Sequence, residues 1–235
     1  MTYSFLILSL LLMIPAVAVW WLRPDLRSVI GLMALVSIPF ALTEPLFYPD
    51  YWEPPFLFDL GNRLGFGIED VLFVMALAAV TSTAWPVVSG QRFQPIDGEF
   101  SRRDAALRIA AVLGICFLMV AALVVADVAM IYGAAIIMTV LGIVICLLRP
   151  DLWIPSLVGA GYTTALYTAL CLLLALLVPD VFSEHWNTEE FLDLYVLGIP
   201  LEELIYACTA GFVGASFYPF VTHRRFHRND DGQSQ

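Results

Sequence analysis

The sequence LRPDL occurs twice in this chain, at residues 22–26 and at residues 148–152, and each copy follows a long apolar run. Three further features then recur in the same order. They are a Pro-Asp pair at 49–50 and 179–180, a tryptophan at Trp52 and Trp186, and an acidic pair in GIED at 67–70 and GIPLEE at 198–203. The tryptophan precedes the first acid by 17 residues in one copy and by 16 in the other. Four matches in the same order indicate an internal duplication.

The composition requires a membrane. Hydrophobic residues make up 60% of the chain and charged residues 14%, with a mean hydropathy of +0.85, whereas soluble domains carry about 25% charged residues. A basic residue is absent before Arg23, which favours an uncleaved first span over a signal peptide. Seven apolar runs are long enough to cross a bilayer as helices; they lie at 3–22, 28–47, 66–88, 105–126, 128–148, 154–178 and 194–220. A tight turn at 126–128 must separate the fourth run from the fifth.

Together these features predict an all-α polytopic membrane protein with seven transmembrane helices, built as two parallel three-helix repeats joined by a linker helix. Residues 1–95 form the first repeat, 96–127 the loop and linker helix, 128–225 the second repeat and 226–235 a polar cytoplasmic tail. Three helices plus one return the chain to the same side of the membrane. Equivalent spans therefore run in the same direction, and the axis that relates the repeats lies along the membrane normal.

The arginines predict the orientation of this multi-pass integral membrane protein. All eleven basic residues are arginine. If the N-terminus is outside and the C-terminus cytoplasmic, only Arg63 lies in an outer loop, and the other ten lie inside, as the positive-inside rule requires. The formal net charge of −10 excludes a nucleic-acid partner, because phosphate binding requires a basic surface.

The two acidic pairs, Glu69-Asp70 and Glu202-Glu203, are the first candidates for chemistry. A charged side chain at the centre of a membrane helix costs roughly 2.5–3.5 kcal/mol on insertion scales, so two such pairs need a reason. The third and seventh runs both enter from outside, which predicts that both pairs lie in the outer half and face a shared cavity. Neighbouring helical residues point about 100° apart, so one acid of each pair should face inward. We favour Glu69 and Glu202 as these working acids, because burial favours the neutral, proton-donating form of a carboxyl group.

A plainer alternative is that these acids lie at helix N-termini, where the helix dipole stabilises them, and merely mark the membrane interface. Glu44 is a third candidate, because it precedes Pro45 near the outer end of the second run, although its counterpart in the second repeat is apolar.

Aromatic residues are concentrated near the expected outer boundary, among them Trp52, Trp186, Tyr51 and Tyr195. They form either an interfacial aromatic belt or a set of π faces around a developing carbocation. No metal-binding motif, dinucleotide fingerprint or Asp-rich diphosphate motif occurs in the sequence. We therefore expect neither a metal nor a cofactor.

The stretch GIPLEELIY at 198–206, which follows Trp186 in an outer loop, resembles the membrane lycopene cyclases. In that family two three-helix units, fused or separate, each carry a Pro-x-Glu-Glu/Asp signature. The resemblance covers essentially the whole chain, except that the first motif, FGIED at 66–70, lacks the proline. It implies a cofactor-independent, non-redox isomerisation that closes β-ionone rings at the ends of lycopene.

In that reaction a protonated carboxyl group adds H⁺ to the terminal double bond, the neighbouring double bond attacks the cation, and a base then removes a proton. The resemblance implies Glu202 as the first working acid, with Glu69 as its partner and Glu203 and Asp70 beside them. It also implies Tyr206 as a substrate contact. A lipophilic polyene would enter from the membrane lipid, and a second copy of the chain or other carotenoid enzymes are the protein partners that it suggests.

Three other functions remain open. A cyclase with the same mechanism could act on another polyprenyl substrate. A small-solute transporter of three-plus-one-plus-three architecture would need a cavity lined with amides and hydroxyls, and the spans offer few such groups beyond those at 81–83 and 163–164. A non-catalytic subunit could also contribute one acid to a site on another chain.

Overall fold

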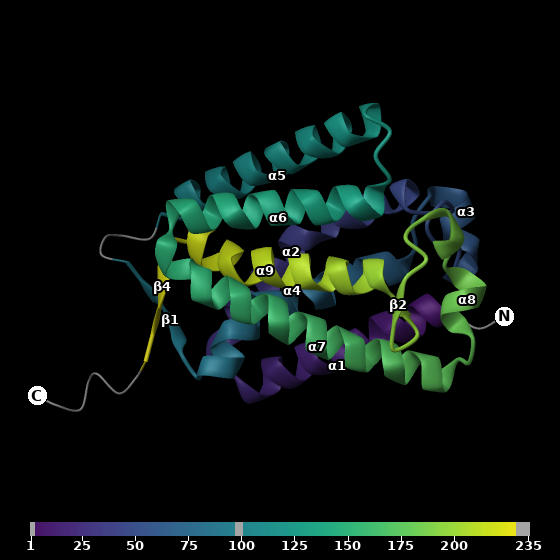
Figure 1. Cartoon of the computed structure of the whole chain (residues 1–235). Helices are drawn as coiled ribbons and strands as arrows, with labels where there is room; N and C mark the ends of the chain where they lie inside the picture. Colours follow the sequence, from purple (N-terminus) through teal and green to yellow (C-terminus); the bar gives the residue numbers. More distant parts are fainter. Residues whose placement is uncertain (1–2, 97–100, 229–235) are drawn as a thin grey trace, which may run out of the picture.

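Seven long apolar helices form one bundle in the computed structural model, which describes residues 3–96 and 101–228 (Figure 1). Each is long and apolar enough to cross a membrane, which confirms the predicted spans and the mostly helical class. The helices are α1 (Ser4–Leu22), α2 (Arg27–Ser37) with its continuation η2 (Ile38–Leu46), α4 (Ile68–Ser89), α5 (Arg102–Val125), α6 (Met130–Leu148), α7 (Trp153–Leu177) and α9 (Leu201–Val221).

Short elements close the two ends of the bundle. At the acidic end, where α4 and α9 begin, lie α3 (Leu60–Leu64), α8 (Val181–His185) and the hairpin of β2 (Tyr195–Val196) and β3 (Ile199–Pro200). At the opposite sheet end, β1 (Arg92–Pro95) pairs with β4 (Arg224–His227). Figure 1 shows that α1 begins at the acidic end and that β4 lies at the sheet end. The remaining single turns are η1 (Pro24–Leu26), η3 (Leu57–Asp59), η4 (Pro150–Leu152) and η5 (Thr188–Glu190).

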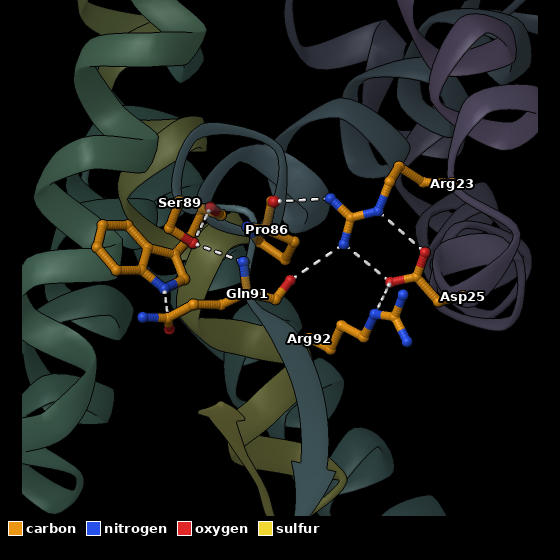
Figure 2. A network of polar contacts seen from close by, with 7 residues as sticks. Arg23, Asp25, Pro86, Ser89, Gln91 and Arg92 are labelled. Carbon is orange, nitrogen blue, oxygen red and sulfur yellow. Dashed lines mark hydrogen bonds and ion pairs between the residues drawn. The ribbon is translucent and has the colours of Figure 1, made fainter. Parts of the chain in front are cut away.

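The first LRPDL copy turns the chain from α1 into α2 at the sheet end. The guanidinium of Arg23 donates to both carboxylate oxygens of Asp25, at 2.9 and 2.8 Å, and Pro24 begins the single turn η1. The same guanidinium donates to the backbone carbonyl oxygens of Pro86 and Gln91, at 2.9 and 3.1 Å (Figure 2). One arginine therefore fixes the turn between two helices and attaches it to the end of α4.

The second LRPDL copy builds the same device between α6 and α7. Arg149 donates to both carboxylate oxygens of Asp151, at 2.8 and 2.7 Å, and to the backbone carbonyl of Arg224, at 3.0 Å. The second turn is thus attached to the chain just beyond α9, as the first is to the end of α4.

Two boundaries differ from the sequence prediction, and a third agrees with it. The second span is not one α-helix, because η2 continues it as a 3₁₀-helix in which Pro39 and Pro45 lack the backbone donors that an α-helix uses. The seventh span was expected from residue 194, but α9 begins at Leu201, because the preceding residues form the β2–β3 hairpin around Gly198 at φ 81°. The turn expected at 126–128 is present, with Asp127 at φ 55°.

The end of the chain also differs from the expected polar tail. Phe226 and His227 belong to β4, and the Phe226 ring packs against Phe93 and Trp85, with ring centroids 5.0 and 6.1 Å apart. An aromatic residue that packs in this way extends the ordered structure. Residues 229–235 of the predicted tail and 97–100 of the predicted loop lie outside the described residues.

At the acidic end the two repeated tryptophans meet. Trp52 and Trp186 face each other in an antiparallel β-bridge, with ring centroids 5.3 Å apart. The Glu53 amide donates to the His185 carbonyl, and the Asn187 amide donates to the Tyr51 carbonyl, each at 2.8 Å. The loops that contain Trp52 and Trp186 are therefore joined directly at the acidic end of the bundle.

Candidate functional site

A cavity of about 270 Å³ extends from the acidic end into the bundle between η2, α4, α5, α6 and α9. Its lining is almost entirely apolar, as is usual for small-molecule sites. Asp70 and Glu203, in the first turns of α4 and α9, lie at one extreme, whereas Thr81 and Phe217 lie further along the same helices. The lining is thus long and apolar, with carboxyl groups only toward the acidic end.

Three buried carboxyl groups line this cavity: Glu44, Asp70 and Glu203. Glu44 reaches it from η2, where the tighter 3₁₀ winding places Ala41 and Glu44, three residues apart, on one buried face. Asp70 and Glu203 reach it because each is the third residue of its helix and lies on the inward side. Buried acids of this kind need partners, and the three have different ones.

Glu203 accepts three hydrogen bonds from aromatic side chains. Its Oε1 accepts from the Tyr51 hydroxyl at 3.1 Å and from the Trp186 indole N–H at 2.9 Å. Its Oε2 accepts from the Tyr167 hydroxyl at 2.7 Å. Burial and the nearby acids raise the pKa of Tyr51 well above its ordinary value, so this hydroxyl keeps its proton. Three donors suit a carboxylate, which only accepts.

Glu44 and Asp70 form a carboxyl pair, because their side chains lie close enough to interact directly. A hydrogen bond between two carboxyl groups requires that one of them carries a proton. The Trp52 indole N–H donates to Glu44 Oε1 at 2.8 Å, and the Gly67 amide donates to Asp70 Oδ2 at 2.6 Å. These donors fix the carboxyl pair at the cavity wall.

Glu69 and Glu202 hold outer loops instead of lining the cavity. The Leu57 amide donates to Glu69 Oε1 at 2.7 Å, and the Leu192 amide donates to Glu202 Oε1 at 2.9 Å, where Tyr132 also donates at 3.4 Å. Both acids are the second residues of their helices and are buried, with exposed fractions of 0% and 2%. Glu69 and Glu202 are therefore buried, as expected for working acids, and they also lie at helix N-termini, as expected if they only mark the ends of the helices.

The five aromatic candidates separate into three groups. Tyr51, Trp52 and Tyr206 line the cavity, and Trp186 contacts Glu203. Tyr195 lies apart from the cavity lining in β2, is exposed, and shares a hydrogen bond with the Thr188 hydroxyl.

Tyr167 is a residue that the sequence reasoning missed. It lies in the middle of an apolar span and is 2% exposed, although it is one of the three donors to Glu203. Its sequence signal is weak: Thr163 and Cys171 lie four residues before and after it, so the three share one face of α7 and are all buried.

The arrangement suits proton chemistry on an apolar substrate. It offers a pair of adjoining buried carboxyl groups, a third carboxyl group fixed by three donors, and aromatic rings such as those of Phe73 and Tyr206 in the same apolar cavity. Among the residues that the structure describes, no group of His, Cys, Asp and Glu side chains could hold a metal ion.

The family model described as Lycopene cyclase matches residues 129–221 of the chain. The matched segment runs from just before α6 to the last residue of α9, so it contains the second LRPDL copy and the Glu202-Glu203 pair. No curated protein and no solved structure matches the chain.

Proposed function

We propose that this chain is a membrane-embedded carotenoid cyclase that reacts within the cavity described above. The match of residues 129–221 to the Lycopene cyclase family model, which describes enzymes, supports this proposal. The substrate would be lycopene, and the product would carry β-ionone rings. The observation that carries this proposal is the pair of adjoining buried carboxyl groups, Glu44 and Asp70, in the wall of a largely apolar cavity.

The carboxyl pair donates the proton that starts the reaction. That proton bonds to the terminal double bond of the polyene and leaves a tertiary cation. The π electrons of the neighbouring double bond close a six-membered ring and move the positive charge onto a ring carbon. Loss of a proton from the adjacent carbon forms the new double bond. The carboxylate left on the carboxyl pair takes up this proton, so the acid is regenerated and the reaction is an isomerisation.

Glu203 stabilises the cation without exchanging a proton. Tyr51, Trp186 and Tyr167 hold its carboxylate in place, so its negative charge is available before the cation forms and needs no rearrangement. The rings of Phe73 and Tyr206, with centroids 6.5 Å apart, add π faces to the same cavity. The apolar lining excludes water that would otherwise capture the cation.

Glu69 and Glu202, favoured as working acids on sequence alone, have a different role in this proposal. They position the loops that begin α4 and α9, through the Leu57 and Leu192 amides. Their neighbours Asp70 and Glu203 act directly at the cavity.

We further propose that the two halves are parallel three-helix repeats related by a two-fold axis, with α5 as the linker. Residues 133 or 134 positions apart in the sequence adjoin each other at four levels between the two ends of the bundle. The pairs are Trp52 with Trp186, Phe73 with Tyr206, Thr81 with Gly214, and Phe93 with Phe226. A residue adjoins its own counterpart only beside a symmetry axis, which supports an axis that runs between α4 and α9.

Expression in a lycopene-accumulating bacterial host tests the proposed activity. We expect the wild-type chain to convert lycopene into monocyclic or dicyclic carotene, as measured by chromatography. Asp70→Asn and Glu44→Gln should each lower the rate by about 10²–10⁴, the usual contribution of a positioned acid. Glu184→Gln, in α8, is the matched control and should retain activity, because no hydrogen bond joins its side chain to the site acids. Unchanged lycopene in cells that contain the folded wild-type protein would refute the activity.

A transporter finds little support in this cavity. A site for a polar solute would offer several hydroxyl or amide groups, whereas those at the lining are few and include Ser37, Thr43 and Thr81. The Ser37 and Thr81 hydroxyls already donate to carbonyls of their own helices. An apolar substrate fits this lining better, and a polyprenyl compound other than lycopene would fit it for the same reason.

A further inference from the structure

The cavity lies mainly on one side of the proposed two-fold axis, although Phe5 and Leu8 of α1 and Tyr167 of α7 also line it. Under that axis α2 and η2 correspond to α7, α1 to α6, and α4 to α9. On one side α7 packs directly against α1 and α4. At the corresponding place on the other side, residues of α2, α6 and α9 line the cavity.

Two glycines explain the tight packing of α7. A Cβ atom at Gly159 would lie 2.5 Å from the Ala215 Cβ and 2.6 Å from the Gly211 carbonyl, so α7 and α9 approach each other more closely than any larger residue permits. The counterparts of Gly159 and Gly211 in the first half are Met33 and Ala78, and both line the cavity.

One further pair of corresponding residues, Tyr167 and Ala41, differs in side-chain size. Tyr167 lies 18 residues after Arg149, and Ala41 lies 18 residues after Arg23. The large Tyr167 side chain packs against Phe73, donates to Glu203 and lines the cavity from the closed side, whereas its counterpart on the other side is the small Ala41 side chain. The side with Ala41 is open because no side chain there fills the volume that corresponds to the Tyr167 ring.

The outer flank of the cavity is formed by η2 and α5. Phe40 of η2 stacks on Phe117 of α5, with ring centroids 6.5 Å apart and an interplanar angle of 10°. Phe117 is 44% exposed, on the least buried of the seven long helices, and Figure 1 shows α5 diverging from α6 toward the acidic end. This ring pair therefore lies between the cavity and the lipid-facing surface.

We propose that each chain has a single reaction cavity, entered from the hydrocarbon layer between η2 and α5, and that the two ends of a symmetric polyene are cyclised in separate binding events. The inference rests on the proposed cyclisation and specifies how that site takes its substrate. A second cavity for the other end has no room among the described residues, because α7 packs directly against α1 and α4 where that cavity would lie.

Photolabelling in lipid nanodiscs tests the single cavity without requiring catalysis. The probe is a linear isoprenoid hydrocarbon that bears a diazirine, and peptide mass spectrometry locates the label after irradiation. We expect labelling to saturate at one probe per chain, on η2, α5 and the cavity faces of α4, α6 and α9. Two probes per chain, or label on α1 and α7 away from Phe5, Leu8 and Tyr167, which line the cavity, would overturn the proposal.

Ala41→Tyr places a tyrosine at the position that corresponds to Tyr167, so that the added ring fills part of the cavity. It should lower labelling roughly tenfold or more, a change that corresponds to about 1.4 kcal/mol of binding free energy. Leu42→Tyr is the matched control, because Leu42 is 60% exposed and does not line the cavity; it should label as the wild type does. Val120→Trp fills the cavity from α5 and provides the same test if Ala41→Tyr does not fold. Wild-type labelling of a folded, filled variant would contradict the proposal.

Phe117→Ala tests the entry route. Loss of one aromatic contact should raise the labelling rate about two- to tenfold, whereas Leu118→Ala, on the next, 73% exposed residue, should leave the rate unchanged. Equal rates in both variants would show that entry lies elsewhere.

A time course with excess lycopene separates this inference from the proposed function. We expect free monocyclic product to precede dicyclic product, and a later addition of deuterated lycopene should slow formation of the second ring by competition. Dicyclic product that appears first and resists this competition would overturn the separate binding events. A wild-type chain that is labelled as expected but forms no ring would instead refute the cyclase activity and leave the single cavity standing.

Discussion

At the scale of single residues, adjacent acids in this bundle have different surroundings. Consecutive residues of an α-helix point about 100° apart. In α4, Glu69 therefore binds the Leu57 amide while Asp70 faces the cavity, and in α9 Glu202 binds the Leu192 amide while Glu203 faces the cavity. The identity of an acid thus says less about its role than its angular position in the first turn of the helix.

Tyr167→Phe tests the importance of the donors to Glu203. The change removes one hydroxyl that donates to the carboxylate at 2.7 Å, and a hydrogen bond to a charged group contributes about 1.5–3 kcal/mol. We expect the cyclisation rate to fall about tenfold or more, measured with purified protein in lipid. Tyr162→Phe, on the same helix but outside the cavity lining, serves as the control. Equal rates for the two variants would contradict a role for Glu203 as the stabilising carboxylate.

The sequence singled out the buried acids of the acidic end as a set, but not their individual surroundings. Two adjacent acids in an apolar run stand out by their cost in a membrane, and Glu44 stands out in the same way. The direction of each side chain depends on where the helix begins, and those starts are fixed by contacts with distant loops, such as Leu192 with Glu202. Tyr167 has no comparable signal, because a tyrosine in an apolar span is common.

At the scale of elements, the seven helices follow from apolar runs of sufficient length, and their number is confirmed. The 3₁₀ character of η2 could be suspected from Pro39 and Pro45, because each removes a backbone donor. The β2–β3 hairpin was missed, because Tyr195, Val196 and Ile199 are as apolar as the residues of the span that follows. Hydropathy does not distinguish a short apolar hairpin from the first turns of a helix.

Gly159→Ala tests the close contact between α7 and α9. The added Cβ would lie 2.5 Å from the Ala215 Cβ, so the helices must separate. Overpacking of this kind costs about 1–3 kcal/mol, and we expect a lower midpoint of thermal unfolding in detergent. Gly161→Ala is the matched control, because a Cβ there meets nothing within 4 Å. A Gly159→Ala protein as stable as the control would show that the close contact is unimportant for stability.

At the scale of the whole molecule, the duplication in the sequence corresponds to matching structural devices. Both LRPDL copies form an arginine–aspartate pair that is attached to the end of the third helix of its half. A further match, WPVVSGQRF at 85–93 with YPFVTHRRF at 218–226, contains the two strands of the sheet end. This match could have indicated that residue 226 belongs with the preceding segment and not with a polar tail, because its counterpart, Phe93, lies within the first repeat.

The side of the membrane that each end faces is a prediction from the arginines, and cysteine labelling in intact cells tests it. Ser183→Cys lies in an exposed position of α8 at the acidic end, and Asp104→Cys lies in an exposed position at the start of α5. A membrane-impermeant thiol reagent should label Ser183→Cys in intact cells, and Asp104→Cys only after the cells are opened. The reverse pattern would invert the proposed orientation. The chain without either substitution measures the background from its four own cysteines.

The carboxyl pair has a consequence for the order of biosynthesis. Glu44, Asp70 and their donors, Trp52 and Gly67, all belong to the first half of the chain, so a nascent chain that leaves the ribosome has these partners together before α6 is translated. Glu203 is different, because its partners come from both halves: Tyr51 is made early, and Tyr167 and Trp186 late. Synthesis of α9 therefore brings Glu203 to donors from both halves of the chain, after the donors of Glu44 and Asp70 are already in place.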